Sequence, residues 1–175
     1  MELKDKTAFI TGGASGLGKA TAEYFIAAGA KVMLFDLSPE NAEAAAQELG
    51  EKADWSAGDV SNESDVKRAI LKTKERFGGL HININSAGIG AAARTLGKNG
   101  PMAIQQFEFV IKVNLLGTFN CLRLCAAEMK DNEQQTEDGE KGVIINVASV
   151  AAFDGQIGQA AYSASKAGVA GMTLP

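Results

Sequence analysis

The sequence predicts an α/β protein with a doubly wound parallel sheet, in which helices cover both faces and produce three α/β/α layers. Short runs rich in β-branched and aromatic residues alternate along the chain with longer segments of helical periodicity. These strand-like runs are continuously apolar, which is typical of strands buried on both faces of a parallel sheet. A glycine-rich turn also joins the first run to the first helical segment.

The composition indicates an ordinary globular protein. Its 175 residues are 46% hydrophobic and 22% charged, which predicts one domain spanning 1–175. The net charge of −4 provides no basic field for phosphate backbones, so nucleic acid is not an expected partner. No apolar run reaches spanning length, so a membrane is not expected either. The start of the chain resembles neither a secretory signal nor an Arg-rich transit peptide, which favours a cytoplasmic location.

The first two predicted strands and helices have clear boundaries. Residues 7–11 form a β-branched and aromatic run, and the helical segment after the glycine-rich turn closes at Gly29. Residues 31–36 form the second predicted strand. The next helix begins with Ser38 as its cap and Pro39 in its first turn, a common arrangement at helix starts.

Three further strands continue the alternation. The third runs to 58–60 and precedes a helix that begins near Glu63. The fourth, at 81–88, leads through an irregular stretch into a long helix near 103–130, and the fifth lies at 142–149. This order of strands and helices predicts parallel pairing throughout.

Some residues outside this pattern are predicted to be structural. Residues 94–101 indicate a surface insertion, and 131–140, with five acidic residues, indicate a solvated loop. Cys121 and Cys125 are expected to fill one helix face as small hydrophobic residues, and His81 is expected to be structural. A metal site is not expected, because a zinc site needs more ligands than these.

The first turn, TGGASGLGKA, has the glycines that a diphosphate-binding turn needs. Gly12 permits the sharp turn, Gly16 lets phosphates approach the backbone, and Gly18 lets the helix pack against the sheet. The stretch Gly13–Lys19 also fits G-x-x-x-x-G-K, but Ala20 lacks the hydroxyl that this rival motif requires for magnesium. The glycines alone are equally consistent with a structural turn.

Two aspartates strengthen the dinucleotide interpretation. Asp36 ends the second strand 18 residues after Gly18, where its carboxylate can accept both ribose hydroxyls of an adenosine. The same charge repels a 2′-phosphate, so NAD is favoured over NADP as the cofactor. Asp59, at the end of the third strand, suits the adenine amino group. Each aspartate alone is equally consistent with a helix cap.

Three sequence patterns together resemble those of one enzyme family. The first is T-G-x-x-x-G-x-G from Thr11 to Gly18, and the second is N-S-A-G from Asn85 to Gly88. The third is a polar set with serine 13 positions before tyrosine and tyrosine four before lysine: Asn114, Ser149, Tyr162 and Lys166. On these residues the chain resembles the short-chain dehydrogenase/reductase family, with serine in place of the second asparagine of the family's N-N-A-G element. The resemblance implies that the polar set is the catalytic tetrad.

The resemblance implies a Rossmann fold and an NAD-dependent oxidoreductase. Residues 142–175 and the NLLGTFN run resemble the branch that oxidises 3-hydroxyacyl-CoA thioesters, hydroxysteroids and small secondary alcohols. The resemblance also implies a homo-oligomer, dimer or tetramer, and makes the mitochondrial matrix an alternative location. Cofactor contacts are expected from a set that spans these motifs: Gly12, Ser15, Gly16, Leu17, Gly18, Asp36, Asp59, Val60, Asn85, Ser86, Ala87, Gly88, Tyr162 and Lys166.

The spacing of the tyrosine and the lysine suits oxidation of an alcohol. A free tyrosine is too protonated at neutral pH to act as a base, and a nearby cation favours its phenolate. Lys166 stands one helical turn after Tyr162, so both lie on one helix face. Ser149 can hydrogen-bond the substrate oxygen. By resemblance Asn114 holds a water leading to the lysine, although alone it would be interpreted as a capped or kinked helix position.

Substrate contacts are expected from Ser149, Gln156, Gln159 and Tyr162, although loop glutamines are usually only solvated. Family members continue with further strands and a substrate lid, so we expect the last strands of the family fold to be missing from this chain. The alternative function is therefore a dinucleotide-binding or dimerisation module without turnover. We expect this chain alone to bind NAD weakly, to aggregate readily and to turn over slowly.

Overall fold

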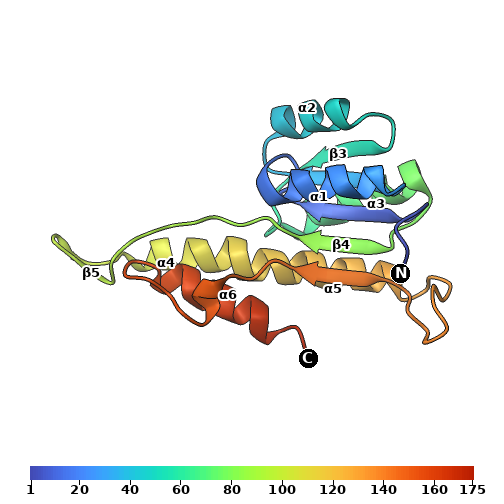
Figure 1. The fold of residues 1–175 in the computed structure, drawn as a ribbon. Helices are drawn as coiled ribbons and strands as arrows, with labels where there is room; N and C mark the ends of the chain where they lie inside the picture. Colours follow the sequence, from blue (N-terminus) through green and yellow to red (C-terminus); the bar gives the residue numbers. More distant parts are fainter.

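The computed structural model describes all residues from 1 to 175 and confirms the doubly wound α/β sheet. Five parallel strands lie in the order β3-β2-β1-β4-β7, with helices on both faces (Figure 1). The strands are β1 (Thr7–Thr11), β2 (Lys31–Asp36), β3 (Ala53–Ala57), β4 (Ile82–Asn85) and β7 (Val143–Asn146). The chain moves outward from β1 to β3 and then returns to β4 on the other side of β1. The strand order therefore reverses beside β1, where a doubly wound sheet opens a crevice for ligands.

The helices fill the connections that the sequence predicts. They are α1 (Gly16–Ala27), α2 (Pro39–Leu49), α3 (Glu63–Phe77), α4 (Ile104–Ile111), η1 (Lys112–Gly117), α5 (Thr118–Met129), η2 (Val150–Ala152) and α6 (Ala160–Gly171). Ser38 caps α2 through its side chain, with Pro39 in the first turn, as predicted. Figure 1 shows α4, η1 and α5 as one long helix, with α6 packed at its α4 end.

Two apolar clusters form the core, one on each face of the sheet. Ile10, Leu34 and Ile82 pack on the α1 and α2 side, whereas Phe9 and Phe35 stack on the α3 and α5 side, with ring centroids 5.4 Å apart. Cys121 and Cys125 lie fully buried in the second cluster, as small hydrophobic residues. Burial raises the pKa of the Cys121 thiol to about 12, so this thiol stays protonated.

The long helix from Ile104 to Met129 has 26 residues and is, by length and composition, apolar enough to cross a membrane. No apolar segment of this length was expected from the sequence. In the structure one face of this helix packs on the sheet and buries the two cysteines, as a core helix does. Its middle segment η1 is a π-helix, which widens the turn that carries Asn114.

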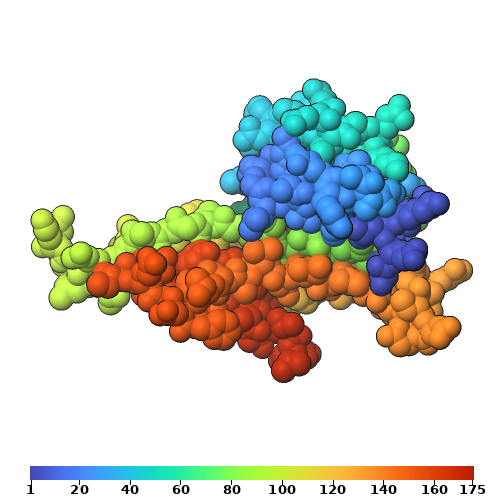
Figure 2. Space-filling model, in the orientation of Figure 1, coloured from blue at the N-terminus to red at the C-terminus, as the bar shows by residue number.

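Several strands and loops differ from the predicted boundaries. β4 ends at Asn85 and β7 at Asn146, so Ser149 lies in the connection beyond its strand. The insertion is an exposed antiparallel hairpin of β5 (Leu96–Gly97) and β6 (Gly100–Pro101), which projects from the body of the molecule (Figure 2).

The acidic loop at 131–140 is more than a solvated segment. Gln135 accepts a hydrogen bond from the Lys6 ammonium, and Asn132 donates to the carbonyl of Leu80 (2.8 Å). These contacts tie the loop to the strand ends opposite the crevice. His81 also lies there, and its Nδ1 accepts a hydrogen bond from the Thr7 N–H (3.2 Å).

Candidate functional site

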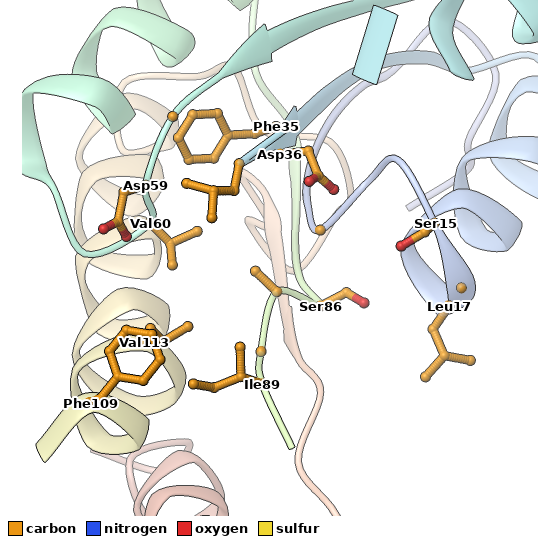
Figure 3. A pocket seen from close by; sticks show the side chains of 16 residues that line it. Ser15, Leu17, Phe35, Asp36, Asp59, Val60, Ser86, Ile89, Phe109 and Val113 are labelled. Atoms are coloured by element: carbon orange, nitrogen blue, oxygen red, sulfur yellow. The ribbon is translucent and has the colours of Figure 1, made fainter. Parts of the chain in front are cut away.

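A cavity of about 430 Å³ opens at the carboxyl ends of β1, β2 and β4 (Figure 3). It lies where the strand order reverses, as the fold predicts. Its walls come from the turn after β1, the ends of β2 and β4, the loop after β3, and the long helix. The lining residues are Gly12, Ser15, Gly16, Leu17, Phe35, Asp36, Leu37, Gly58, Asp59, Val60, Ser86, Ala87, Gly88, Ile89, Phe109 and Val113.

The turn after β1 requires glycine for steric reasons. Gly12 and Gly16 have φ of 63° and 51°, in the left-handed region. A Cβ at Gly12 would lie 2.9 Å from the Cα of Ala87, so the turn packs directly on the residues after β4. A Cβ at Gly18 would lie 2.1 Å from the Gly12 carbonyl oxygen. Gly18 therefore lets α1 approach the turn itself, rather than the sheet as predicted.

The start of α1 is open to an anion. Ser15, its N-cap residue, makes no side-chain capping hydrogen bond, and the first turn of the helix contains no acidic residue. A Cβ at Gly16 would have no neighbouring atom within 4 Å, so the backbone there faces open space. Ser15, Gly16 and Leu17 line the cavity, so the start of the helix, with its free N–H groups and partial positive charge, forms part of the cavity wall.

Asp36 is fixed above the glycine turn by backbone donors. Its Oδ2 accepts a hydrogen bond from the Ala14 N–H (3.1 Å) and its Oδ1 accepts one from the Ser38 N–H (3.3 Å). In Figure 3, Asp36 and Asp59 lie toward one end of the cavity, and Ile89 and Phe109 toward the other.

Asp59 lies in the loop after β3, two residues beyond the strand. Its Oδ1 accepts hydrogen bonds from the N–H and the hydroxyl of Ser61, both 2.8 Å. Neither aspartate is a helix cap, because Ser38 caps α2 and Asn62 caps α3. The structure therefore favours the ligand-facing interpretation over the alternative that the sequence left open.

Ten of the predicted cofactor residues line this cavity, and four do not. Gly18 supports the turn, as described above. Asn85 is 2% exposed and donates to Asn83 and Asn146 (both 2.8 Å), so it joins β4 to β7 instead of facing the cavity. Tyr162 and Lys166 lie beyond the end formed by Gly88.

Most of the apolar wall was not predicted from the sequence, namely Phe35, Leu37, Gly58, Ile89, Phe109 and Val113. Phe109 and Val113 stand four positions apart on the long helix, so one helical face supplies both. This spacing was a usable signal, although an apolar helix position more often faces the core.

A second cavity of about 330 Å³ contains Ser149, Gln159 and Tyr162, together with Gly90, Ala91 and Ala92. The Ser149 Oγ accepts a hydrogen bond from the Ala151 N–H (3.2 Å), which leaves its own hydrogen available for another acceptor. Gln156 does not line this cavity. It lies in an adjacent groove with Gln159, whose side-chain oxygen accepts from the Gln156 N–H (2.9 Å).

Lys166 lies behind Tyr162, on the same face of α6. Its Nζ donates to the Val147 carbonyl (2.8 Å) and lies 5.8 Å from the centroid of the Tyr162 ring. The residue is 6% exposed, and this burial lowers the pKa of its ammonium from the ordinary value.

Asn114, in the π-helical turn, ties the long helix to the segment after β4 and to α6. Its Oδ1 accepts from the Ile89 N–H (2.8 Å), and its Nδ2 donates to the Ile89 carbonyl (3.0 Å) and to Ser165 (3.1 Å). A Cβ at Gly88 would lie 3.2 Å from this Oδ1 and 3.6 Å from the Lys166 Nζ. The end of the larger cavity is therefore in contact with two of the four predicted catalytic residues.

Comparison with known proteins agrees with this geometry. Residues 6–174 match the family model described as short chain dehydrogenase. The chain belongs to the short-chain dehydrogenase family. It is 50% identical over 175 residues to the 3-hydroxyacyl-CoA dehydrogenase type-2 proteins of Bos taurus and Homo sapiens, covering 99% of this chain and 67% of each relative.

A solved structure from the same family gives the same result. The crystal structure of 3-hydroxyacyl-CoA dehydrogenase type-2 from Mycobacterium avium superposes with a TM-score of 0.89 at 37% identity. The match covers 96% of this chain and 66% of that one. The chain thus spans about two thirds of the length of these short-chain dehydrogenases.

Proposed function

We propose that the chain binds NAD in the larger cavity and acts as an oxidoreductase on a secondary alcohol or ketone of the 3-hydroxyacyl-CoA type. The observation that carries this proposal is the position of Gly88. It lines the cavity at the carboxyl edge of the sheet and also adjoins Lys166 and Asn114. A dinucleotide that extends from Asp36 to Gly88 would end beside the tetrad.

The residues present fit a dinucleotide. The uncapped start of α1 and the open backbone at Gly16 suit a diphosphate. Asp36 suits a pair of ribose hydroxyls, and because both its oxygens are held by backbone N–H groups, it cannot readily turn away from a 2′-phosphate. This arrangement supports NAD rather than NADP as the cofactor.

In this proposal the chemical roles divide among the four residues of the tetrad. Bound NAD supplies the acceptor for the hydride that leaves the alcohol carbon. Tyr162 removes the hydroxyl proton, and the positive charge of Lys166 behind it favours the phenolate form. Ser149 donates a hydrogen bond to the substrate oxygen as its charge changes. Asn114 holds the segment after β4 against α6, which fixes the distance between the two cavities.

The class of substrate rests on the relatives. Proteins 50% identical to this chain are named 3-hydroxyacyl-CoA dehydrogenases, which makes a 3-hydroxyacyl-CoA thioester the first substrate to test. Gln159 supports this choice, because it lines both the tyrosine cavity and the adjacent groove of about 610 Å³, which offers room for a long substrate.

A dinucleotide-binding module without turnover is the second candidate. The larger cavity has walls from 16 residues, whereas only six line the cavity at Tyr162. Val150, Phe153 and Ile157, near the catalytic serine and tyrosine, are 77%, 87% and 86% exposed. Water therefore reaches this region readily, which weakens the influence of a lysine on a neighbouring phenol.

Two measurements on the purified chain separate these candidates. NADH fluorescence on mixing reports binding, and NADH formation from a 3-hydroxyacyl-CoA reports turnover. The enzyme proposal predicts both signals. Binding without turnover supports the module, and the absence of binding contradicts both candidates.

A further inference from the structure

Two residues of the cavity wall, Asp59 and Val60, lie on a short loop between β3 and α3. This loop is held by side chains from two different helices. We propose that Asn120 on α5 is a positioning residue that fixes this loop for the adenosine half of the cofactor, with Asp65 on α3 as the second anchor. The inference rests on the proposed NAD site.

Asn120 is bound to the loop by a directed, buried hydrogen bond. Its Nδ2 donates to the Val60 carbonyl (2.8 Å), and the residue is only 7% exposed. Its Oδ1 accepts from Arg123 (2.8 Å), which in turn pairs with Glu63 at the start of α3. Because the oxygen is occupied by Arg123, the NH₂ group is the side of the amide that faces Val60.

The long helix also packs tightly on the loop. A Cβ at Gly117 would lie 2.5 Å from the Val60 Cγ2, so the helix approaches Val60 more closely than any other residue there would allow. A loss of the Asn120 bond would leave the buried Val60 carbonyl without its partner. An unpaired buried carbonyl costs free energy, which would favour a shift of the loop away from the helix.

Asp65 holds the other side of the loop. Its Oδ2 accepts from the Asp59 N–H (3.1 Å), and this bond, together with Arg68, keeps the pKa of the Asp65 carboxyl below its ordinary value. A Cβ at Gly58 would lie 2.7 Å from the Asp65 Cβ, so the loop packs closely against α3 as well as against the long helix.

Asn120 and Asp65 together form a clamp on the loop, and the position of the loop determines where the Asp59 carboxylate points. Ser61 occupies its Oδ1, which leaves Oδ2 for an amino group of a ligand. The adenine amino group is the proposed partner, so the clamp acts on recognition of adenine rather than on the reacting end. If the loop relaxed, the affinity for a cofactor that carries this amino group would fall more than the affinity for a cofactor that lacks it.

The test is a titration of the full chain with NAD and with deamino-NAD, in which a carbonyl replaces the adenine amino group. Three proteins are compared: the wild type, Asn120→Ala, and the matched control Asn132→Ala. Asn132 also donates to a backbone carbonyl at 2.8 Å, but at Leu80, on the opposite edge of the sheet. Thermal unfolding reports the stability of each protein.

We expect the wild type to prefer NAD. Asn120→Ala should weaken NAD binding about three- to tenfold, the range that one lost hydrogen bond gives, and weaken deamino-NAD less. Asn132→Ala should lower stability and leave both affinities unchanged. An unchanged preference for NAD in folded Asn120→Ala would overturn this inference, whereas no NAD binding by the wild type would overturn the proposed function.

The second anchor supplies variants in case Asn120→Ala does not fold. Asp65→Ala removes the acceptor for the Asp59 N–H, whereas Asp65→Asn keeps an acceptor oxygen at the same position. Loss of the preference for NAD in Asp65→Ala and its recovery in Asp65→Asn would support the clamp. Equal preferences in both variants and in the wild type would contradict it.

Discussion

At the scale of single residues, backbone N–H groups orient the two aspartates of the cavity. Asp36 is held at both oxygens, by Ala14 and Ser38, and Asp59 at one oxygen, by Ser61. A carboxylate held in this way is in place before a ligand arrives. The sequence predicted both aspartates from their positions after strands. It did not predict these hydrogen bonds, because they depend on the path of the turns.

Replacing Asp36 with alanine is expected to narrow the preference for NAD over NADP. The change removes the acceptor for the ribose hydroxyls and also the charge that repels a 2′-phosphate. NAD affinity should fall about tenfold or more, as for lost hydrogen bonds to a charged group, while NADP affinity falls less or rises. Fluorescence titrations with NADH and NADPH measure the ratio. Asp54→Ala, at a carboxylate outside the cavity, is the control, and an unchanged ratio in Asp36→Ala would refute the assignment.

His81 should make stability depend on pH. Burial, with Lys6 and Lys31 nearby, lowers the pKa of its imidazole, and the neutral ring accepts the Thr7 N–H. The imidazole binds a proton more readily in the unfolded chain than in the folded one. The contribution of His81 to the free energy of unfolding is therefore complete above the unfolded pKa, about 6.5. This contribution is lost as the pH falls from about 6.5 through the lower pKa of the folded state. Urea unfolding at pH 8 and pH 5 should show a smaller loss of stability for His81→Ala than for the wild type; equal losses would contradict this role.

At the scale of elements, the sequence predicted the five strands and their helices because continuous apolar runs identify buried parallel strands. The strand ends were less predictable, since pairing partners decide where β4 and β7 stop. The π-helical turn at Asn114 was not predicted. It accompanies hydrogen bonds to Ile89 and Ser165, which are distant in the sequence.

The close contact between α1 and the glycine turn predicts that Gly18→Ala is strongly disruptive. The added methyl would lie 2.1 Å from the Gly12 carbonyl oxygen, so the helix or the turn must move. We expect a loss of stability of about 1–3 kcal/mol, as for overpacked cores, and a loss of NAD binding. Gly171→Ala in α6, where a Cβ meets no atom within 4 Å, is the control. Urea midpoints measure the difference, and equal midpoints would show that the turn can adapt.

The cavity walls, like the π-helical turn, depend on contacts between segments that are distant in the sequence. Motif positions indicated the glycines and aspartates, but Phe109 and Val113 belong to no motif, and Asn120, which closes the NLLGTFN run, had no predicted role. They reach the cavity or its loop only because the long helix crosses the sheet beside β4. Their roles follow from packing between elements, which a single sequence does not encode in a short pattern.

At the scale of the whole molecule, apolar residues on the long helix favour self-association. Leu116 and Phe119 stand three positions apart on its outer face and are 54% and 50% exposed. We expect sedimentation to report a dimer or tetramer at micromolar concentrations, and Leu116→Glu to shift the equilibrium toward monomer. Leu71→Glu on α3, where the leucine is 56% exposed, is the matched control. A wild type that stays monomeric at all concentrations would contradict this expectation.

Gly88 lines the larger cavity and adjoins Lys166, which lies behind Tyr162 of the other cavity. The central claim is that the two cavities act together, one holding NAD and the other providing the base. The most direct test compares wild type, Tyr162→Phe and Lys166→Ala for NAD affinity and for NADH formation from a 3-hydroxyacyl-CoA. Tyr162→Phe keeps the ring and loses the ionisable oxygen, so turnover should disappear while NAD affinity stays within about twofold. Lys166→Ala should reduce both. Full turnover by Tyr162→Phe would contradict the account.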